Sequence, residues 1–398
     1  MQVISVLFYT LCAALLVAIP AACASAIFLI GLESVGNLRE SIPYWYLGLP
    51  PAGLLIGYTY HRMNAEVQGG SSTVMAKART GNGKMPLIMM PFILGTTWLT
   101  HLVGGSAGRE GTAIQMSSAM ADAWQRYFQH PAFDQRLWIQ MGISAGFASV
   151  FGTPWAGALF AWEVSKQAWN LNPLKFTAYI RPAAILSAAL LANAIVDLWP
   201  VQHTHYPIGE VNMINLFTIS SIIIAALAFG LAARLFILWH TAVQQFMHWI
   251  MPYPMFRPLL GGVVLMCIFM IPVTHPFAGL GIPQIVNAFE GISAPHEWIS
   301  KLMLTGLTLG TGFTGGEVTP LFFIGATLGS AAGAILPISH ALLAAAGFTA
   351  VFAGATRTAF ASSIMGLELF GIAAFPWILL ACLISVWVAG KKSIYAHT

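Results

Sequence analysis

The chain has 398 residues, of which 58% are hydrophobic and only 8% are charged, and its mean hydropathy is +0.76. This composition excludes a soluble globular protein, and apolar runs that are continuous rather than alternating exclude a β-barrel. The net charge of +4 is no more than the orientation signal of a membrane protein requires, so we expect no nucleic-acid partner. The four cysteines stand alone in apolar runs, which excludes a disulfide framework or a metal site, and we expect no cofactor.

Apolar stretches long enough to cross a lipid bilayer as helices, which takes about 17–25 residues, occur throughout the chain. Four of them are residues 3–32, 183–199, 216–233 and 373–389. The first has no positively charged leader region, so we expect a retained helix rather than a signal peptide. Basic residues in short connectors and near the end of the chain indicate cytoplasmic loops: Lys77, Arg79, Lys84, Lys391 and Lys392.

The polar segments between the apolar stretches are too short to form separate domains. The sequence therefore predicts an all-α integral membrane protein with one multi-pass domain over residues 1–398 and no soluble domain. We expect it in a cell membrane, which in a bacterium is the inner membrane.

Two glycine-rich segments interrupt the apolar sequence and predict broken helices. They are residues 104–108 and 310–316. Each leads into a Gly-x-Glu-x-Thr pattern, at residues 108–112 and 315–319, which places Glu110 and Glu317 in matching contexts. A carboxylate at membrane depth costs roughly 2.5–3.5 kcal/mol, so both glutamates are predicted to be functional.

An internal repeat accounts for the two matching patterns. Ala-Gly-Phe-Ala-Ser-Val-Phe at 145–151 follows the first pattern, and Ala-Gly-Phe-Thr-Ala-Val-Phe at 346–352 follows the second at nearly the same distance. Each is followed by an apolar segment with one acid, Glu163 or Glu368. We expect two homologous halves, approximately residues 1–205 and 206–398, arranged as an inverted repeat of tilted and broken helices, as in many transporters.

The chemistry of Gly-x-Glu-x-Thr at a helix break favours an anion. Glycines let the backbone turn and approach an ion closely, and the next residues begin a helix with unpaired N–H groups. Such a helix start attracts an anion without a mobile cation, so the anion can also leave. An ionised glutamate at that position competes with the anion, whereas a protonated one releases the site, which predicts proton-coupled anion exchange.

These motifs resemble the CLC family of anion channels and proton-coupled antiporters. Gly-Arg-Glu-Gly-Thr at 108–112 is similar to the family's Gly-Arg-Glu-Gly-Pro, and Gly69-Gly70-Ser71 to the start of its Gly-Ser-Gly-Ile-Pro segment. Further similarity covers Phe-Gly-Thr-Pro at 151–154 through Phe160, Gly316–Pro320, and Gly-Lys-Lys-Ser-Ile-Tyr at 390–395. The resemblance implies a homodimer with one pathway in each subunit.

It also implies the site residues. Glu110 takes the place of the external gating glutamate, and Glu317 lies at the centre of the pathway. The anion-binding candidates are Ser71, Gly108, Arg109, Gly111, Thr112, Gly316, Val318, Thr319 and Tyr395.

Departures from the common family pattern indicate one branch. Thr112 replaces proline, Val318 replaces phenylalanine, and Glu317 followed two residues later by Thr319 resembles the fluoride/proton antiporters. Chloride/proton antiporters usually carry an internal proton glutamate directly after the position of Glu163, and this chain has Val164 there. We therefore expect a transporter that exports fluoride in exchange for protons, with Glu317 supplying the missing acid, and not an enzyme.

Two alternatives remain. Ser71 is the residue that chloride proteins of the family keep for anion coordination, which favours a chloride-selective antiporter or channel. An intramembrane lipid phosphatase would use the glutamates as acid and base. That enzyme also needs a phosphate-binding arginine close by, and Arg109 is the only basic residue next to a glutamate motif.

Several of the residues also have purely structural interpretations. Arg109 can pair with Glu110, Glu163 and Glu368 can be acids at the membrane edge, and Ser71 and Thr319 can be helix caps. A tyrosine as near the end of the chain as Tyr395 is usually interfacial. Core packing is expected of Phe313, Phe322 and Phe323, and the histidines form no ligand set: His101, His203, His205, His240, His248 and His275.

Overall fold

The computed structural model describes residues 2–63, 69–165, 177–204, 206, 208–209 and 215–395. Helices make up the regular structure of these segments, and they contain no β-strand beyond two isolated bridges. The all-helical prediction is therefore confirmed.

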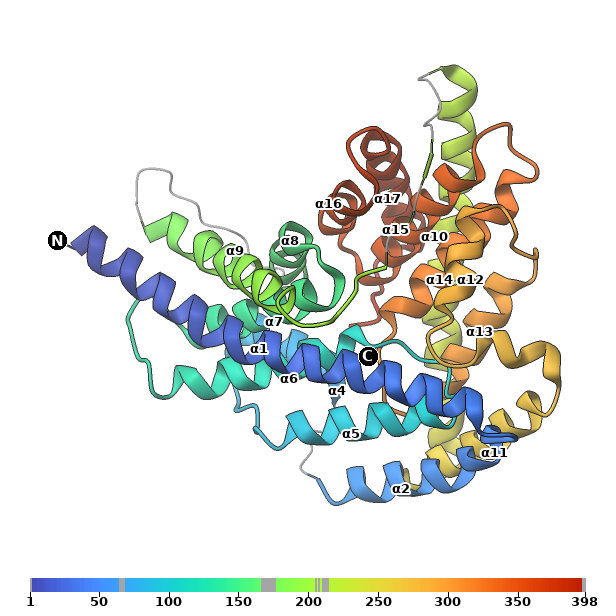
Figure 1. Ribbon diagram of the computed structural model, residues 1–398, viewed down its shortest axis with the longest axis horizontal. Coiled ribbons are helices and arrows are strands. Elements are labelled where there is room, and N and C mark those ends of the chain that lie inside the picture. Colours follow the sequence, from blue (N-terminus) through green and yellow to red (C-terminus); the bar gives the residue numbers. More distant parts are fainter. Residues whose placement is uncertain are drawn as a thin grey trace.

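The helices of the first half follow one another through short connectors. They are α1 (Gln2–Ser41), η1 (Trp45–Gly48), α2 (Leu49–His61), α4 (Gly70–Thr80), α5 (Met89–Leu102), α6 (Glu110–Gln125), α7 (Gln135–Phe151), α8 (Pro154–Ser165) and α9 (Thr177–Val196). The long helix α1 lies across α6, α7 and α9, as Figure 1 shows.

The second half repeats this pattern. Its helices are α10 (Leu216–Ile250), η2 (Pro254–Phe256), α11 (Arg257–Phe269), η3 (Pro272–Phe277), α12 (Ile282–Phe289), α13 (Glu297–Gly310), α14 (Val318–Gly333), α15 (His340–Thr356), α16 (Ala359–Phe370) and α17 (Phe375–Ala389). Helix lengths recur in order: α5 and α13 have 14 residues each, α6 and α14 have 16, α7 and α15 have 17, and α8 and α16 have 12.

Most of these helices are too short to cross a bilayer. Within the described segments, three helices are long and apolar enough to do so, and they lie in α1, α9 and α10. A 16-residue helix is only about 24 Å long, whereas the hydrocarbon layer is about 30 Å thick. The predicted span at residues 373–389 is shorter than expected, because α17 has 15 residues and reaches only about 22 Å.

Small residues allow the central helices to pack closely. In the second half, a Cβ atom on Gly325 of α14 would lie 2.0 Å from the Gly347 carbonyl oxygen of α15. In the first half, a Cβ atom on Gly142 of α7 would lie 2.6 Å from Cα of Ser118 in α6. Helices in lipid gain little from apolar burial and associate through such close packing. The α6–α7 and α14–α15 pairs thus form the rigid centre of each half.

Candidate functional site

The two predicted helix breaks meet at one point. α5 ends at Leu102 and α6 begins at Glu110, while α13 ends at Gly310 and α14 begins at Val318. The Gly108 N–H donates to the Gly316 carbonyl at 2.5 Å, and the Gly316 N–H donates to the Gly108 carbonyl at 2.8 Å. A Cβ atom on Gly316 would lie 2.9 Å from the Gly111 nitrogen. Glycine is therefore required for the starts of α6 and α14 to come together.

The Glu110 carboxylate reaches across this junction to the start of α14. One of its oxygens accepts the hydroxyl hydrogen of Thr319, and the other accepts the Thr319 backbone N–H at 3.1 Å. The Arg109 N–H donates to the same carboxylate at 3.1 Å, and Glu110 is completely buried. A carboxylate held by helix-start donors occupies the kind of position that suits an anion.

The Arg109 side chain interacts with the Glu110 carboxylate more weakly than Thr319 does. Its Nε atom lies 3.6 Å from Oε1 of Glu110, and its side chain is 17% exposed. Its contacts agree with the structural interpretation of this arginine.

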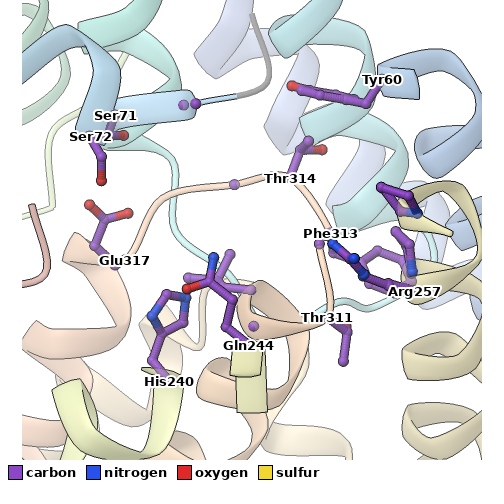
Figure 2. A pocket seen from close by; sticks show the side chains of 18 of the residues that line it. Tyr60, Ser71, Ser72, His240, Gln244, Arg257, Thr311, Phe313, Thr314 and Glu317 are labelled. Carbon is purple, nitrogen blue, oxygen red and sulfur yellow. The ribbon is translucent and has the colours of Figure 1, made fainter. Parts of the chain in front are cut away.

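Glu317 occupies the N-cap position of the same helix, α14, but its side chain makes no cap hydrogen bond and faces a different space. Its carboxylate points toward Ser71 and Ser72, as Figure 2 shows, and it lines a cavity of about 350 Å³. We call this the Glu317 cavity; the other residues that line it include Tyr60, Gln115, His240, Gln244, Arg257, Thr311, Phe313 and Thr314. The Tyr395 side chain is hydrogen-bonded to the Glu317 carboxylate.

Ser71 and Gly111 complete this side of the junction. Ser71 lies in the first turn of α4, and its hydroxyl accepts a hydrogen bond from the Gln115 amide at 3.3 Å. A Cβ atom on Gly111 would lie 2.9 Å from the Ser71 oxygen and 3.7 Å from Oε2 of Glu317. The absence of a side chain at Gly111 thus leaves the space in which these two groups approach each other.

The segment after α17 places Tyr395 at the centre of the protein rather than at its surface. The Ser393 hydroxyl donates to the Thr356 carbonyl at 3.2 Å, and the Ile394 N–H donates to the Ala355 carbonyl at 3.0 Å. Tyr395 is 2% exposed. These bonds to the end of α15 hold the Tyr395 ring beside Glu317.

The structure therefore brings most of the predicted residues together on two sides of the glycine junction. Gly108, Arg109, Glu110 and Thr319 lie on one side, and Ser71, Gly111, Glu317 and Tyr395 on the other. Thr112 and Val318 are neighbours of these residues in the chain, but their side chains have other partners. The Thr112 hydroxyl pairs with that of Thr97 in α5 at 2.9 Å, and Val318 is buried in the apolar core.

Glu163 and Glu368 cap each other's helices. The Glu163 carboxylate, on α8, accepts the N–H groups of Phe360 and Ala361 at the start of α16, at 3.3 and 2.6 Å. The Glu368 carboxylate, on α16, accepts those of Trp155 and Ala156 at the start of α8, at 3.0 and 2.8 Å. Each acid satisfies backbone donors that a helix start leaves unpaired.

Val164, which follows Glu163, lies among cations. Its carbonyl accepts a hydrogen bond from Nε of Arg79 at 2.8 Å. It lines a cavity of about 420 Å³ together with Arg79, Arg357 and Lys391. A proton passing here would meet positive charge and an apolar side chain.

The phenylalanines and the histidine considered from the sequence lie in different surroundings. Phe313 lines the Glu317 cavity, Phe322 lies beside Glu110, and Phe323 is buried with the Lys301 ammonium 5.2 Å from its ring. His101 is hydrogen-bonded through both ring nitrogens to the carbonyls of Thr97 and Ala107.

Sequence reasoning missed residues that lie beside Glu110. A small cavity of about 20 Å³, which we call the Glu110 cavity, is lined by polar groups from three parts of the chain. These are Arg109, Glu110, His203, Thr204, Tyr206 and Thr319. The middle three belong to the connector between the two halves, and no pattern in the sequence indicates that this connector contacts Glu110.

Fold and junction together define a multi-pass, all-helical membrane protein with two homologous halves, whose broken helices meet at Gly108 and Gly316. A family model described as voltage gated chloride channel matches residues 52–390. A chloride/fluoride channel protein of Pseudomonas syringae pv. tomato is 40% identical over 386 residues, which cover 96% of this chain and 84% of that protein. The chain belongs to this family, the CLC proteins.

Solved structures agree. A crystal structure of a CLC-type fluoride/proton antiporter matches with a TM-score of 0.89 and 29% identity, covering 99% of this chain and 97% of the other. A slow cyanobacterial Cl⁻/H⁺ antiporter shares the fold, with a TM-score of 0.84 and 21% identity, covering 97% and 96%.

Proposed function

We propose that the protein is a fluoride/proton antiporter that exports fluoride in exchange for protons, with Glu110 as the gating glutamate and Glu317 as the central proton-handling and anion-handling glutamate. The observation that carries the proposal is the position of the Glu110 carboxylate on the hydroxyl and N–H of Thr319. In this position an ionised Glu110 fills the site that a transported anion would need.

In this proposal, protonation of Glu110 couples the movement of protons to the movement of fluoride. A neutral carboxyl group gains less from the helix start and from the charge-assisted bonds to Thr319, so it leaves the site more readily. A fluoride ion then replaces it and takes the same donors. Return of the carboxylate expels the anion and requires that the proton has been released. Fluoride therefore moves in one direction only when a proton moves in the other.

Glu317 supplies a second acid on the opposite side of the junction. It opens onto the Glu317 cavity and is hydrogen-bonded to Tyr395. The route beside Val164 lacks a titratable acid other than Glu163, whose carboxylate is engaged at the start of α16. Glu317 is therefore the acid through which protons pass between Glu110 and the cytoplasm in this proposal.

Fluoride is favoured over chloride by the Glu317–Thr319 pair and by the relatives. One matching crystal structure is that of a fluoride/proton antiporter, and the protein that is 40% identical is named for both chloride and fluoride. Fluoride is small and strongly hydrated, so several converging donors must replace its water. The hydroxyl groups of Ser71, Thr319 and Tyr395 lie at the junction, and that of Thr319 loses its partner when the Glu110 carboxyl group leaves.

The helix pair α8–α16 supports a homodimer. Trp155 and Phe360, at the starts of these helices, are 54% and 60% exposed in the single chain. Large apolar side chains at the ends of a paired, mutually capped helix unit suit a second copy of the chain. We place the dimer in the inner membrane of a bacterium.

The test is reconstitution of the protein in liposomes with fluoride, chloride and internal pH recorded together. An outward fluoride gradient should drive proton uptake against the proton gradient. Fluoride flux that is independent of protons would make the protein a channel.

Chloride exchange is the second candidate, because the Ser71 hydroxyl lies at the junction beside Gly111. Equal proton movement with chloride and fluoride in the same liposomes would favour it, and proton movement with fluoride alone would exclude it. Replacement of Ser71 by Asn should then leave the fluoride preference intact.

A further inference from the structure

The connector between the two halves lines the same small cavity as Glu110, the proposed gating glutamate. His203, Thr204 and Tyr206 of this connector line the Glu110 cavity together with Glu110 itself. The cavity has a volume of about 20 Å³, which is room for about one water molecule. Glu110 and His203 both line this space, so a water molecule placed there would lie against both residues.

The His203 ring is held in place from two sides. It packs on Gly152 at the end of α7, where a Cβ atom would lie 3.0 Å from the ring and where φ is +72°. Its Nε2 atom lies 3.8 Å from Oδ1 of Asp197, just beyond the end of α9. A carboxylate at this distance attracts a protonated imidazole.

Other titratable groups near His203 are poorly suited to exchange protons with Glu110. An arginine side chain does not give up its proton in a protein, which excludes Arg109. Burial raises the pKa of the Tyr206 phenol above its usual value, and this phenol is hydrogen-bonded to Thr204. Glu33, Arg39, Glu40 and His101 line a neighbouring cavity of about 510 Å³, which shares Arg109 and Thr204 with the Glu110 cavity. Among the residues with described positions, His203 is the histidine that lines the Glu110 cavity, and histidine is the side-chain type suited to proton exchange near neutral pH; His205 lies outside them.

We propose that His203, oriented by Asp197, is the relay residue that passes protons between the outer solution and Glu110. This inference rests on the proposed exchange function. The His203 imidazolium gives an N–H proton to the water in the Glu110 cavity, and that water gives a proton to the Glu110 carboxylate. Neutral His203 then takes a proton from the outer solution. The net result is the transfer of one proton from the outer solution to Glu110, and only O–H and N–H bonds are broken and formed.

The test measures fluoride/proton exchange in liposomes as a function of external pH. The wild-type rate should follow a histidine titration between about pH 6 and 7. In His203→Gln the maximal rate should fall about tenfold, in line with loss of a positioned acid–base group, and this pH dependence should disappear. The number of protons per fluoride should stay the same, because Glu110 still carries the proton.

Controls separate a relay from a structural role. External imidazole should restore the rate of His203→Ala. His275→Gln, which removes a histidine that is bonded to the Phe269 carbonyl at 2.8 Å and does not line the Glu110 cavity, should behave as wild type. In a Glu110→Gln background, His203→Gln should have no further effect.

Wild-type rates and pH dependence in His203→Gln would overturn the relay. If that variant does not assemble, Asp197→Asn is tested instead. A shift to lower pH of the external pH at which the exchange rate is half-maximal supports the relay. An unchanged half-maximal pH overturns it. Failure of the exchange function itself is distinct, since the wild-type protein would then show no fluoride-driven proton movement.

Discussion

The internal repeat carries two pairs of glutamates, and their surroundings differ. Glu163 and Glu368 are equivalent, because each accepts two N–H groups at the start of the helix that bears the other. Glu110 and Glu317 are not equivalent. Glu110 binds Thr319 on the opposite half, whereas Glu317 faces a separate cavity and Tyr395.

Under the proposed function, this contrast separates acids that hold the structure from acids that take part in transport. Reciprocal caps satisfy four backbone donors and leave neither carboxylate to exchange partners with an ion. In the other pair, the symmetry of the repeat is broken: one carboxylate fills the helix start and the other opens onto a cavity. Exchange across a membrane needs such a difference, because the two sides must be reached in turn.

The largest effect is expected for Glu110→Gln. A neutral amide cannot carry a proton or compete with an anion by charge, so proton movement coupled to fluoride should fall at least about a hundredfold. Simultaneous fluoride-electrode and pH recordings from liposomes measure it. Coupled exchange within a few-fold of wild type would show that Glu110 is a structural acid like Glu163.

A smaller effect is expected for Thr319→Val, which removes the hydroxyl donor to Glu110 and keeps the backbone N–H. A hydrogen bond to a charged group contributes roughly 1.5–3 kcal/mol, so exchange should slow about tenfold or more. Thr112→Val is the matched control, because its hydroxyl pairs with Thr97. Exchange rates at several fluoride concentrations distinguish Thr319→Val from Thr112→Val. Equal slowing in both variants would contradict the assignment of the Thr319 hydroxyl to the Glu110 site.

The symmetric pair should affect stability and spare transport. Glu163→Ala and Glu368→Ala each remove a helix cap, which costs about 0.5–2 kcal/mol. Thermal unfolding of the detergent-solubilised protein should show similar losses for both, with an unchanged proton-to-fluoride ratio in liposomes. Strongly unequal losses of thermal stability, or a changed proton-to-fluoride ratio in one variant, would show that Glu163 and Glu368 are not equivalent.

Sequence patterns predicted the parts of the site that depend on local structure. The glycines at 104–108 and 310–316 indicated the breaks, and the repeated motif identified Glu110 and Glu317, because such signals are written within a few residues. The reciprocal caps were not predictable, since they depend on the packing of α8 against α16, which are nearly 200 residues apart in the chain.

Other features depended on tertiary contacts in the same way. Thr112 matched an anion-binding motif, but its hydroxyl turns to Thr97 because α5 packs beside α6. The sequence assigned His203 to no ligand set, and the position of its connector beside the Glu110 cavity leaves no local signal in the sequence. Tyr395 lies at the centre because bonds to α15 hold the final segment there.

The most direct test of the asymmetry compares Glu317→Gln with Glu368→Gln, two identical chemical changes in the second half of the repeat. Proton uptake into liposomes is measured while an outward fluoride gradient is applied. The account predicts that uptake is lost in Glu317→Gln and retained in Glu368→Gln. Wild-type uptake in Glu317→Gln would contradict it.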